Sequence, residues 1–176
     1  RGGVIPIQCK WRPSEKFLQL NLTGLQGDVM KESMSVALTL AWNLTEQGQK
    51  DSIWDAYKGA GLHVHCPEGG VSKDGPSAGT AITVTMYSLF NNKRIKKTVA
   101  ITGEICLTGN VTAIGGLDLK ILGGIKAGVK EFIYPSENQK DFDNFFKIYK
   151  DTPLLEGIVF HSVSKIEEVL TLVFED

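Results

Sequence analysis

Apolar residues recur along the chain with two spacings, one typical of helices and one typical of strands. From Asp28 to Trp42 they return every three or four positions, which predicts an amphipathic helix with Asp28 as its N-cap. Residues 16–22 alternate between apolar and polar positions and predict a strand. Residues 62–66 predict another strand, and residues 98–102 predict a buried one. Helices and strands are therefore mixed from the beginning of the chain.

The second half of the chain continues this alternation. It predicts a hairpin over residues 105–114 that turns at Gly109-Asn110, a helix over 117–127, a strand over 131–134, a helix over 141–149, a strand over 157–161 and a last helix over 163–173. Residues 48–61, by contrast, are polar and contain Gly59-Ala60-Gly61, so we expect a surface connection there. The pattern predicts a mixed α/β (α+β) fold with short mixed sheets and about five to six helices.

One segment combines a loop with the start of a helix. Residues 67–76 carry three glycines and two prolines, too many for the interior of a helix or strand. Pro76 suits the first position of a helix, because its missing N–H would have had no intrahelical partner. The small and apolar residues that follow predict a helix from Ser77 to Phe90. A hydroxyl is thus expected where a glycine-containing loop turns into a helix.

Composition limits the class of protein. With 176 residues, of which 42% are hydrophobic, the chain fits a single domain over residues 1–176 with one core. Its 19 basic and 20 acidic residues give a net charge of -1, so we expect neither nucleic acid nor a membrane as a partner. We find no membrane span and no signal peptide in the sequence. Three cysteines without a CxxC motif favour a reducing compartment, so we expect a soluble, intracellular protein.

Two further features concern the larger protein. The chain begins at Arg1 rather than at a methionine, which we interpret as the start of a fragment of something longer. It contains no GxxxxGK[ST] phosphate loop, so we expect no nucleotide chemistry from this segment.

Ser77 is the first candidate for chemistry, within Lys73-Asp74-Gly75-Pro76-Ser77-Ala78-Gly79. The unpaired N–H groups and partial positive charge at a helix start suit an oxyanion or a phosphate. Pro76 has no N–H, so the oxyanion donors would come from Ser77 and from a residue earlier in the loop. A serine at this position is more often a helix cap than a nucleophile, so Ser77 alone is a weak signal.

A serine nucleophile also needs a base, and a neutral lysine can serve. This requires an apolar site that lowers the lysine pKa from about 10.4 to about 7–8. Lys120 is flanked by Leu119 and two other apolar residues, which would suit it. Lys126 lies about 120° further around the helix, so only one of the two lysines can face the serine. By composition alone, Lys120 also fits an ordinary helix lysine whose stem covers apolar surface.

The sequence leaves other classes of site open. His63 and His65 lie two apart on a predicted strand and, with His161, could form a zinc site of a metal-dependent hydrolase; alternatively, they pack beneath the loop. Cys66 is a weaker nucleophile candidate, because it and its neighbour His65 should point to opposite faces of the strand. A non-catalytic module that assembles a ring is a further alternative. A phosphate-binding loop at 75–79 is disfavoured by the lack of the phosphate-loop lysine pattern.

Several motifs in one order bear on these alternatives. They are His63-Val64-His65-Cys66-Pro67-Glu68-Gly69, Lys73-Asp74-Gly75-Pro76-Ser77-Ala78-Gly79, Thr102-Gly103-Glu104 and Ile114-Gly115-Gly116-Leu117-Asp118-Leu119-Lys120, with Gly27-Asp28-Val29-Met30-Lys31-Glu32-Ser33 before them and Tyr134-Pro135-Ser136-Glu137-Asn138 after them. Together they resemble the peptidase domain of Lon proteases over nearly the whole chain. Val71-Ser72 and Asp118-Leu119 depart from residues usual in that family, but neither change removes a reacting group.

The resemblance implies a function for five residues. Ser77 would attack the peptide carbonyl, while neutral Lys120 takes its proton and later returns it to the leaving amine. Thr102 matches the position whose hydroxyl contacts the catalytic lysine in the family; the alternative is a strand-end threonine bonded to its own backbone. Asp74 belongs to the loop that shapes the oxyanion pocket, where it could equally be a structural turn residue, and Gly75 in the same loop lets backbone and substrate approach closely. No metal and no cofactor is implied for this domain.

The resemblance also implies a larger assembly. Lon proteases are hexameric rings in which a separate ATPase domain, which uses ATP and Mg²⁺, unfolds substrates and feeds them to the peptidase chamber. That ATPase domain would precede Arg1. The expected partners are unfolded or damaged polypeptides and further copies of the same chain, in the cytoplasm or the mitochondrial matrix.

Overall fold

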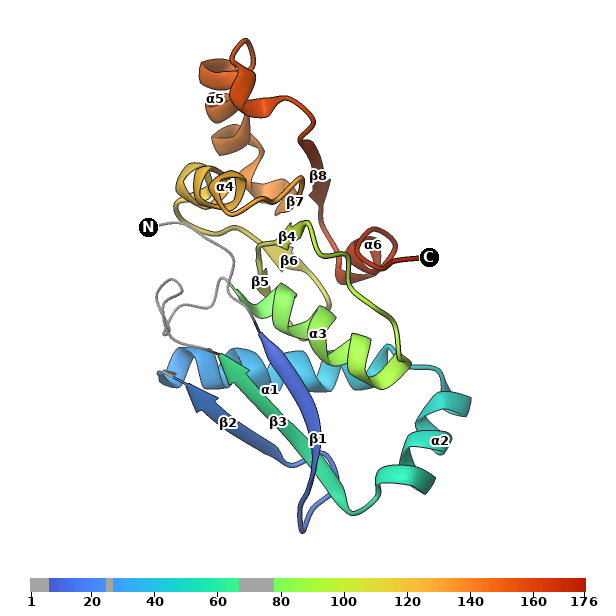
Figure 1. Ribbon diagram of the computed structural model, residues 1–176. Helices are drawn as coiled ribbons and strands as arrows, with labels where there is room; N and C mark the ends of the chain where they lie inside the picture. Colours follow the sequence, from blue (N-terminus) through green and yellow to red (C-terminus); the bar gives the residue numbers. More distant parts are fainter. Residues whose placement is uncertain (1–6, 25–26, 67–77) are drawn as a thin grey trace.

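The computed structural model of the protein describes residues 7–24, 27–66 and 78–176. Within these residues the chain forms three small sheets and six α-helices (Figure 1). The strands are β1 (Gln8–Pro13), β2 (Leu20–Gly24), β3 (Ala60–Cys66), β4 (Val99–Ile101), β5 (Glu104–Ile105), β6 (Val111–Thr112), β7 (Glu131–Pro135) and β8 (Val159–Val163). The helices are α1 (Asp28–Asn43), α2 (Gln47–Tyr57), α3 (Gly79–Asn91), α4 (Leu117–Lys126), α5 (Gln139–Tyr149) and α6 (Ile166–Leu170). The predicted mixed α/β class is confirmed.

The first sheet has β3 at its centre, antiparallel to β1 and parallel to β2. Leu62, Val64 and Cys66 of β3 are buried against a core to which α1 and α3 contribute, whereas His63 and His65 point to the opposite face. This alternation follows from the period of two in a strand. The lower part of the molecule in Figure 1 is therefore a sheet covered on one face by α1 and α3.

The second sheet is parallel, in the order β4-β7-β8. The helices α4 and α5 share one core with it, to which Ile121, Phe132 and Phe145 contribute. A separate core joins β4 and β7 to α3 and α6 through Val84, Ile133 and further apolar side chains. The hairpin β5-β6 lies between the two larger sheets in Figure 1. α3 thus contributes to the cores of both halves of the molecule.

Several predicted boundaries are wrong. Residues 48–61 were expected to be a surface connection, but α2 occupies most of them; only Ile53 of this helix is buried, so its sequence lacks a clear apolar stripe. β1 was not predicted, because this edge strand is largely exposed. The last helix is only Ile166–Leu170, because the residues after it extend to pair with the 94–96 segment.

Smaller corrections concern element ends. The early strand begins at Leu20 rather than at residue 16, and Gly27 rather than Asp28 is the N-cap of α1. The hairpin turn at Gly109-Asn110 is confirmed, with the Cys106 N–H donating to the Asn110 carbonyl at 3.1 Å. α4 ends at Lys126, one residue before the predicted end at residue 127.

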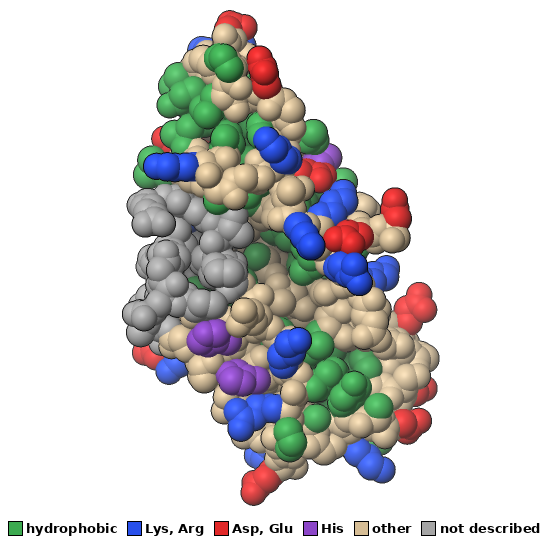
Figure 2. All heavy atoms as spheres, viewed as in Figure 1, with side chains coloured by type: hydrophobic (Ala, Val, Ile, Leu, Met, Phe, Trp, Pro, Cys, Tyr) green, Lys and Arg blue, Asp and Glu red, His purple; other side chains and the backbone are tan. Residues whose placement is uncertain are grey.

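Two findings concern the surface. Figure 2 shows acidic and basic side chains interspersed over one face, in keeping with the near-zero net charge. Across residues 7–24, 27–66 and 78–176, no helix combines the length and apolar character needed to cross a membrane.

Candidate active site

Lys120 lies on α4, at the edge of the face that this helix buries. Leu117, Ile121 and Gly124 form that face, and the lysine is displaced from it by only part of a turn. Gly124 allows a close approach to β7, because an added Cβ would lie 2.6 Å from the Phe132 Cε1 atom. The helix therefore lies tightly on the second sheet. Lys120 itself is half-buried.

Burial changes the acid–base chemistry of this lysine. Loss of solvent around the ammonium lowers the pKa of Lys120 below its ordinary value. Lys126, on the same helix, is exposed, which confirms that the two lysines face different surroundings. One part of the expected environment is wrong: Leu119 is 56% exposed and points away from the core. The neighbouring residues that are buried, Leu117 and Ile121, lie instead on the packed face of α4.

Thr102 directly follows β4 and bonds to the neighbouring strand. Its backbone N–H donates to the Ile133 carbonyl of β7 at 3.0 Å, and its hydroxyl donates to the same oxygen at 3.1 Å. The acceptor lies on β7 and not on the threonine's own segment. The hydroxyl hydrogen is therefore committed, and the Thr102 oxygen can meet a lysine amine only as an acceptor.

The start of α3 docks on the segment that follows Thr102. The Thr80 N–H donates to the Gly103 carbonyl at 3.1 Å. Gly103 has φ +137°, and an added Cβ would lie 2.5 Å from Val111 Cγ1, so glycine is required at this contact. Gly79 lies similarly close to Ile105, with an added Cβ 2.8 Å from its Cγ2 atom. The first turn of α3 and the Thr102 motif are thus joined directly.

The predicted nucleophile lies outside the described residues. α3 begins at Gly79, with Ala78 as its N-cap, where the sequence predicted a start at Ser77. Ser77 and the predicted loop residues Asp74 and Gly75 belong to 67–77, outside the described residues. The Thr80 N–H is already paired with Gly103, so it cannot serve as an oxyanion donor.

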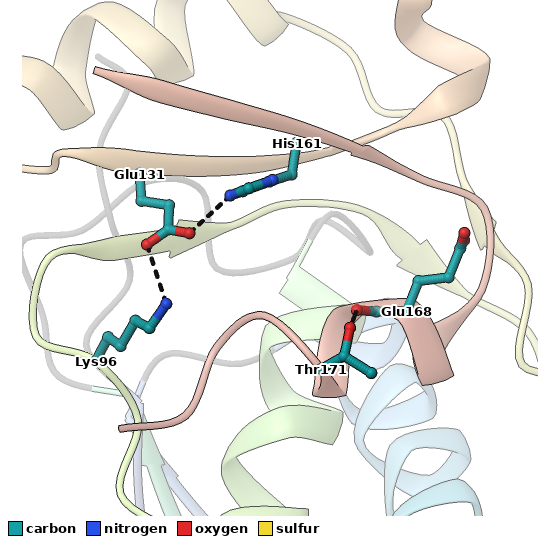
Figure 3. A network of polar contacts seen from close by, with 5 residues as sticks. All are labelled: Lys96, Glu131, His161, Glu168 and Thr171. Carbon is teal, nitrogen blue, oxygen red and sulfur yellow. Dashed lines mark hydrogen bonds and ion pairs between the residues drawn. The ribbon is translucent and has the colours of Figure 1, made fainter. Parts of the chain in front are cut away.

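His161 is held apart from His63 and His65. His63 Nε2 and His65 Nδ1 lie 2.8 and 2.7 Å from the same hydroxyl oxygen, that of Thr23. His161 lies on the other three-stranded sheet, where its Nε2 atom is 2.7 Å from a Glu131 carboxylate oxygen; the other oxygen of that carboxylate is 3.4 Å from Lys96 Nζ (Figure 3). In the part of the chain that the structure describes, no three histidine, cysteine, aspartate or glutamate side chains gather as a metal site. The three histidines do not form the alternative zinc site.

Two of the three cysteines are poorly suited to act as nucleophiles. Cys66 is 1% exposed and faces the core, away from His65, as expected from their adjacent positions. Burial raises the pKa of Cys9 to about 12, which keeps that thiol protonated. Cys106 is exposed near the tip of the β5-β6 hairpin.

Asn138 is a residue to which the sequence assigned no role. It is 2% exposed, and its side chain bonds to the backbone of Ile114, shortly before α4. The stretch Tyr134–Asn138 was part of the family resemblance, but nothing in the sequence indicated that this amide reaches back across 24 residues.

Comparison with known proteins decides the family. A sequence model of the Lon protease (S16) C-terminal proteolytic domain matches residues 1–176. The chain belongs to this family. The Lon protease of Fusobacterium nucleatum is 42% identical over 175 residues, covering 98% of this chain and 22% of that protein. The Lon protease of Treponema pallidum is 42% identical over 173 residues (98% and 19%), and that of Borrelia duttonii is 41% identical over 176 residues (98% and 20%).

The resemblance inferred from the motifs is thus confirmed. The chain spans about a fifth of the length of these relatives. Neither the family nor the arrangement of the histidines favours a metal-dependent hydrolase.

Proposed function

We propose that this chain is a serine endopeptidase domain in which Ser77 is the nucleophile and Lys120 the general base. The observation that carries the proposal is the half-buried Lys120, whose pKa is lowered by desolvation, in a chain of the Lon proteolytic family. A lysine that loses its proton more easily can accept one from a serine hydroxyl.

The chemistry proceeds in two stages. Neutral Lys120 takes the hydroxyl proton as Ser77 Oγ bonds to the peptide carbonyl carbon, and the carbonyl oxygen becomes an oxyanion. The lysine returns this proton to the leaving amine, so that the C–N bond breaks and an acyl-serine remains. Water then attacks the ester, with Lys120 again accepting and returning a proton.

The supporting residues act on these two groups. Thr102 accepts a hydrogen bond from the Lys120 amine and orients it, because its own hydroxyl hydrogen is already donated to Ile133. Asp74 and Gly75 shape the loop that supplies oxyanion donors with the Ser77 N–H. Ser77 is joined by one peptide bond to Ala78, which is 6% exposed and precedes the docked start of α3.

The domain requires no cofactor of its own for this reaction. ATP and Mg²⁺ serve an ATPase domain of the longer protein, which unfolds substrates for a homohexameric ring. The domain by itself cleaves peptides and unfolded chains without ATP, and it degrades folded proteins poorly. Efficient ATP-stimulated degradation of a folded substrate by this chain alone would contradict that division.

Two substitutions and a matched control test the dyad. Ser77→Ala and Lys120→Ala are expected to lower kcat for a fluorogenic peptide by at least about a thousandfold. Lys126→Ala removes an exposed lysine from the same helix and should leave kcat near that of the parent protein. Labelling of Ser77 by a serine-directed covalent inhibitor should depend on Lys120. Full activity in Lys120→Ala would refute the proposed base.

A further inference from the structure

Asn138 is one of very few polar side chains in the described chain that are almost fully buried, at 2% exposure. Its carboxamide oxygen and both of its N–H hydrogens have hydrogen-bond partners. Its Oδ1 atom accepts from the Ile114 N–H at 2.9 Å, and its Nδ2 atom donates to the Ile114 carbonyl at 2.8 Å. The second Nδ2 hydrogen goes to Asp141 Oδ2 at 2.8 Å. The carboxamide thus pairs with Ile114 as a neighbouring strand would.

Ile114 is the last firmly held residue before α4. It is followed by Gly115 and Gly116, and an added Cβ on either would meet nothing within 4 Å. Gly116 has φ +68°, a conformation that glycine adopts without strain. The two glycines are permissive and little restrained by their neighbours, so they cannot by themselves fix where the helix begins.

The position of Lys120 depends on that beginning. The Lys120 N–H donates to the Gly116 carbonyl at 3.1 Å, so the lysine belongs to the first turn of α4. On the α5 side, the start of the helix borders a hollow of about 410 Å³. Packing from that side is therefore incomplete, although Leu117, the first residue of α4, is buried in the core shared with α5. The hydrogen bonds to Ile114 and the buried Ile114 side chain hold the segment directly before the helix.

Glu137 strengthens the same anchor. Its Oε1 atom accepts from the Ala113 N–H at 2.9 Å, so two successive N–H groups of this segment are taken by two successive side chains. Glu137 itself is exposed. Replacing it removes a hydrogen bond without leaving a void in the core.

We propose that Asn138, assisted by Glu137, is a positioning residue for Lys120: by pairing with both backbone groups of Ile114 it fixes the start of α4 and thereby the placement of the lysine amine. This inference rests on the proposed function of Lys120. Asn138 touches neither a substrate nor the reacting atoms in this role. It acts through the backbone that carries the base.

A residue that only stabilises the fold would not change the acid–base behaviour of the site. If the start of α4 loosens, Lys120 becomes better solvated and its pKa rises towards the ordinary value. The base is active only when neutral, so activity would then require a higher pH. A shifted pH profile therefore distinguishes positioning from stability.

The experiment compares Asn138→Ala, Glu137→Ala and Glu137→Gln by the pH dependence of peptide hydrolysis. For Asn138→Ala we expect kcat at pH 7 to fall by about tenfold to a hundredfold, KM to stay within about twofold, and the acidic limb of the kcat profile to move up by about one pH unit. Glu137→Ala should show a smaller shift in the same direction. Glu137→Gln keeps an acceptor for the Ala113 N–H and should match the parent protein.

Asn91→Ala is the matched control for lost stability. Asn91 is a half-buried asparagine whose side chain donates to the Tyr87 carbonyl at 3.0 Å and to Thr45 Oγ1 at 3.2 Å, at the far end of α3. Its substitution should lower the thermal midpoint and leave the acidic limb where it is. Midpoints measured for every variant show which ones are folded in the assay.

The outcomes separate the two proposals. A folded Asn138→Ala whose acidic limb coincides with that of the parent overturns the positioning role. If Asn138→Ala does not fold, Glu137→Ala decides: an unchanged profile overturns the inference and a shifted one supports it. Failure of the proposed function gives a different result, because Lys120→Ala would then retain activity whatever the Asn138 variant does.

Discussion

Thr102 gives both its backbone N–H and its hydroxyl hydrogen to one acceptor, the carbonyl oxygen of Ile133, at 3.0 and 3.1 Å. These two hydrogen bonds to one oxygen fix the rotamer of Thr102 at the end of β4. It also leaves only lone pairs on the hydroxyl oxygen for other partners. Such a group can hold a lysine amine by accepting its N–H, and it has no hydrogen left to donate to the nitrogen lone pair that must take the proton from serine.

Substitution of Thr102 tests this orientation. Thr102→Val has nearly the same shape and keeps the backbone bond to Ile133, but it has no oxygen for the lysine. We expect kcat for peptide hydrolysis to fall by about tenfold, equivalent to one hydrogen bond of about 1.4 kcal/mol. Thr102→Ser keeps the hydroxyl and should retain most activity. Equal activity in the valine and serine variants would exclude a role for the oxygen.

Removal of the Lys120 charge should stabilise the fold. Because burial lowers its pKa, the protonated lysine is less favourable in the folded state than in the unfolded state. Lys120→Met should therefore abolish activity while raising the free energy of unfolding at neutral pH, by less than about 1 kcal/mol because solvent still screens a half-buried ammonium. Lys126→Met, at an exposed position of the same helix, serves as the control and should show no such gain.

The pH dependence of that gain has a definite sign. Below the folded-state pKa of Lys120, both states carry the proton and the penalty of burial is complete. As pH rises from that value towards about 10.4, the ordinary lysine pKa, the folded state loses the proton first and the penalty shrinks. The stability advantage of Lys120→Met should therefore decrease with rising pH in denaturant titrations. An advantage that grows with pH would contradict a lowered pKa.

Peptide hydrolysis should be insensitive to metal removal. His63 and His65 share the Thr23 hydroxyl, and His161 pairs with Glu131 on the other three-stranded sheet, so these side chains are engaged in separate places. Activity measured without ATP should be unchanged after dialysis against EDTA. An activity that is lost with EDTA and restored by Zn²⁺ would revive the metal-dependent alternative.

Two helix glycines should respond to alanine in opposite directions. A Cβ on Gly124 would lie 2.6 and 2.7 Å from ring atoms of Phe132, so Gly124→Ala should push α4 from β7 and cost about 1–3 kcal/mol of stability. Gly48 lies in α2 with nothing within 4 Å of an added Cβ, so Gly48→Ala should stabilise by about 0.4–1 kcal/mol. Urea unfolding of both variants tests these two predictions. An unchanged free energy of unfolding in Gly124→Ala would show that α4 can shift away from β7 at little cost.

The elements that could be predicted are those whose burial is written into a local pattern. α1 and α4 have a buried stripe, and β3 alternates between buried and half-exposed residues, so each was recognised from periodicity. α2 was missed because it buries only Ile53 and is otherwise polar. β1 was missed because it is an exposed edge strand held by backbone bonds to β3. Backbone hydrogen bonds between distant segments do not change the pattern of apolar and polar residues along the sequence, so this pattern does not reveal them.

By itself, the sequence determined the mixed α/β class, the order of most elements and the family, because periodicity and motif order are properties of contiguous residues. It also indicated that Lys120 and Lys126 must face different ways. Only the tertiary structure decided how far Lys120 is buried, since exposure depends on how α4 packs within the fold. The pairing of Asn138 with Ile114 was likewise decided there. Both depend on segments brought together by packing, and neither leaves a local signal along the chain.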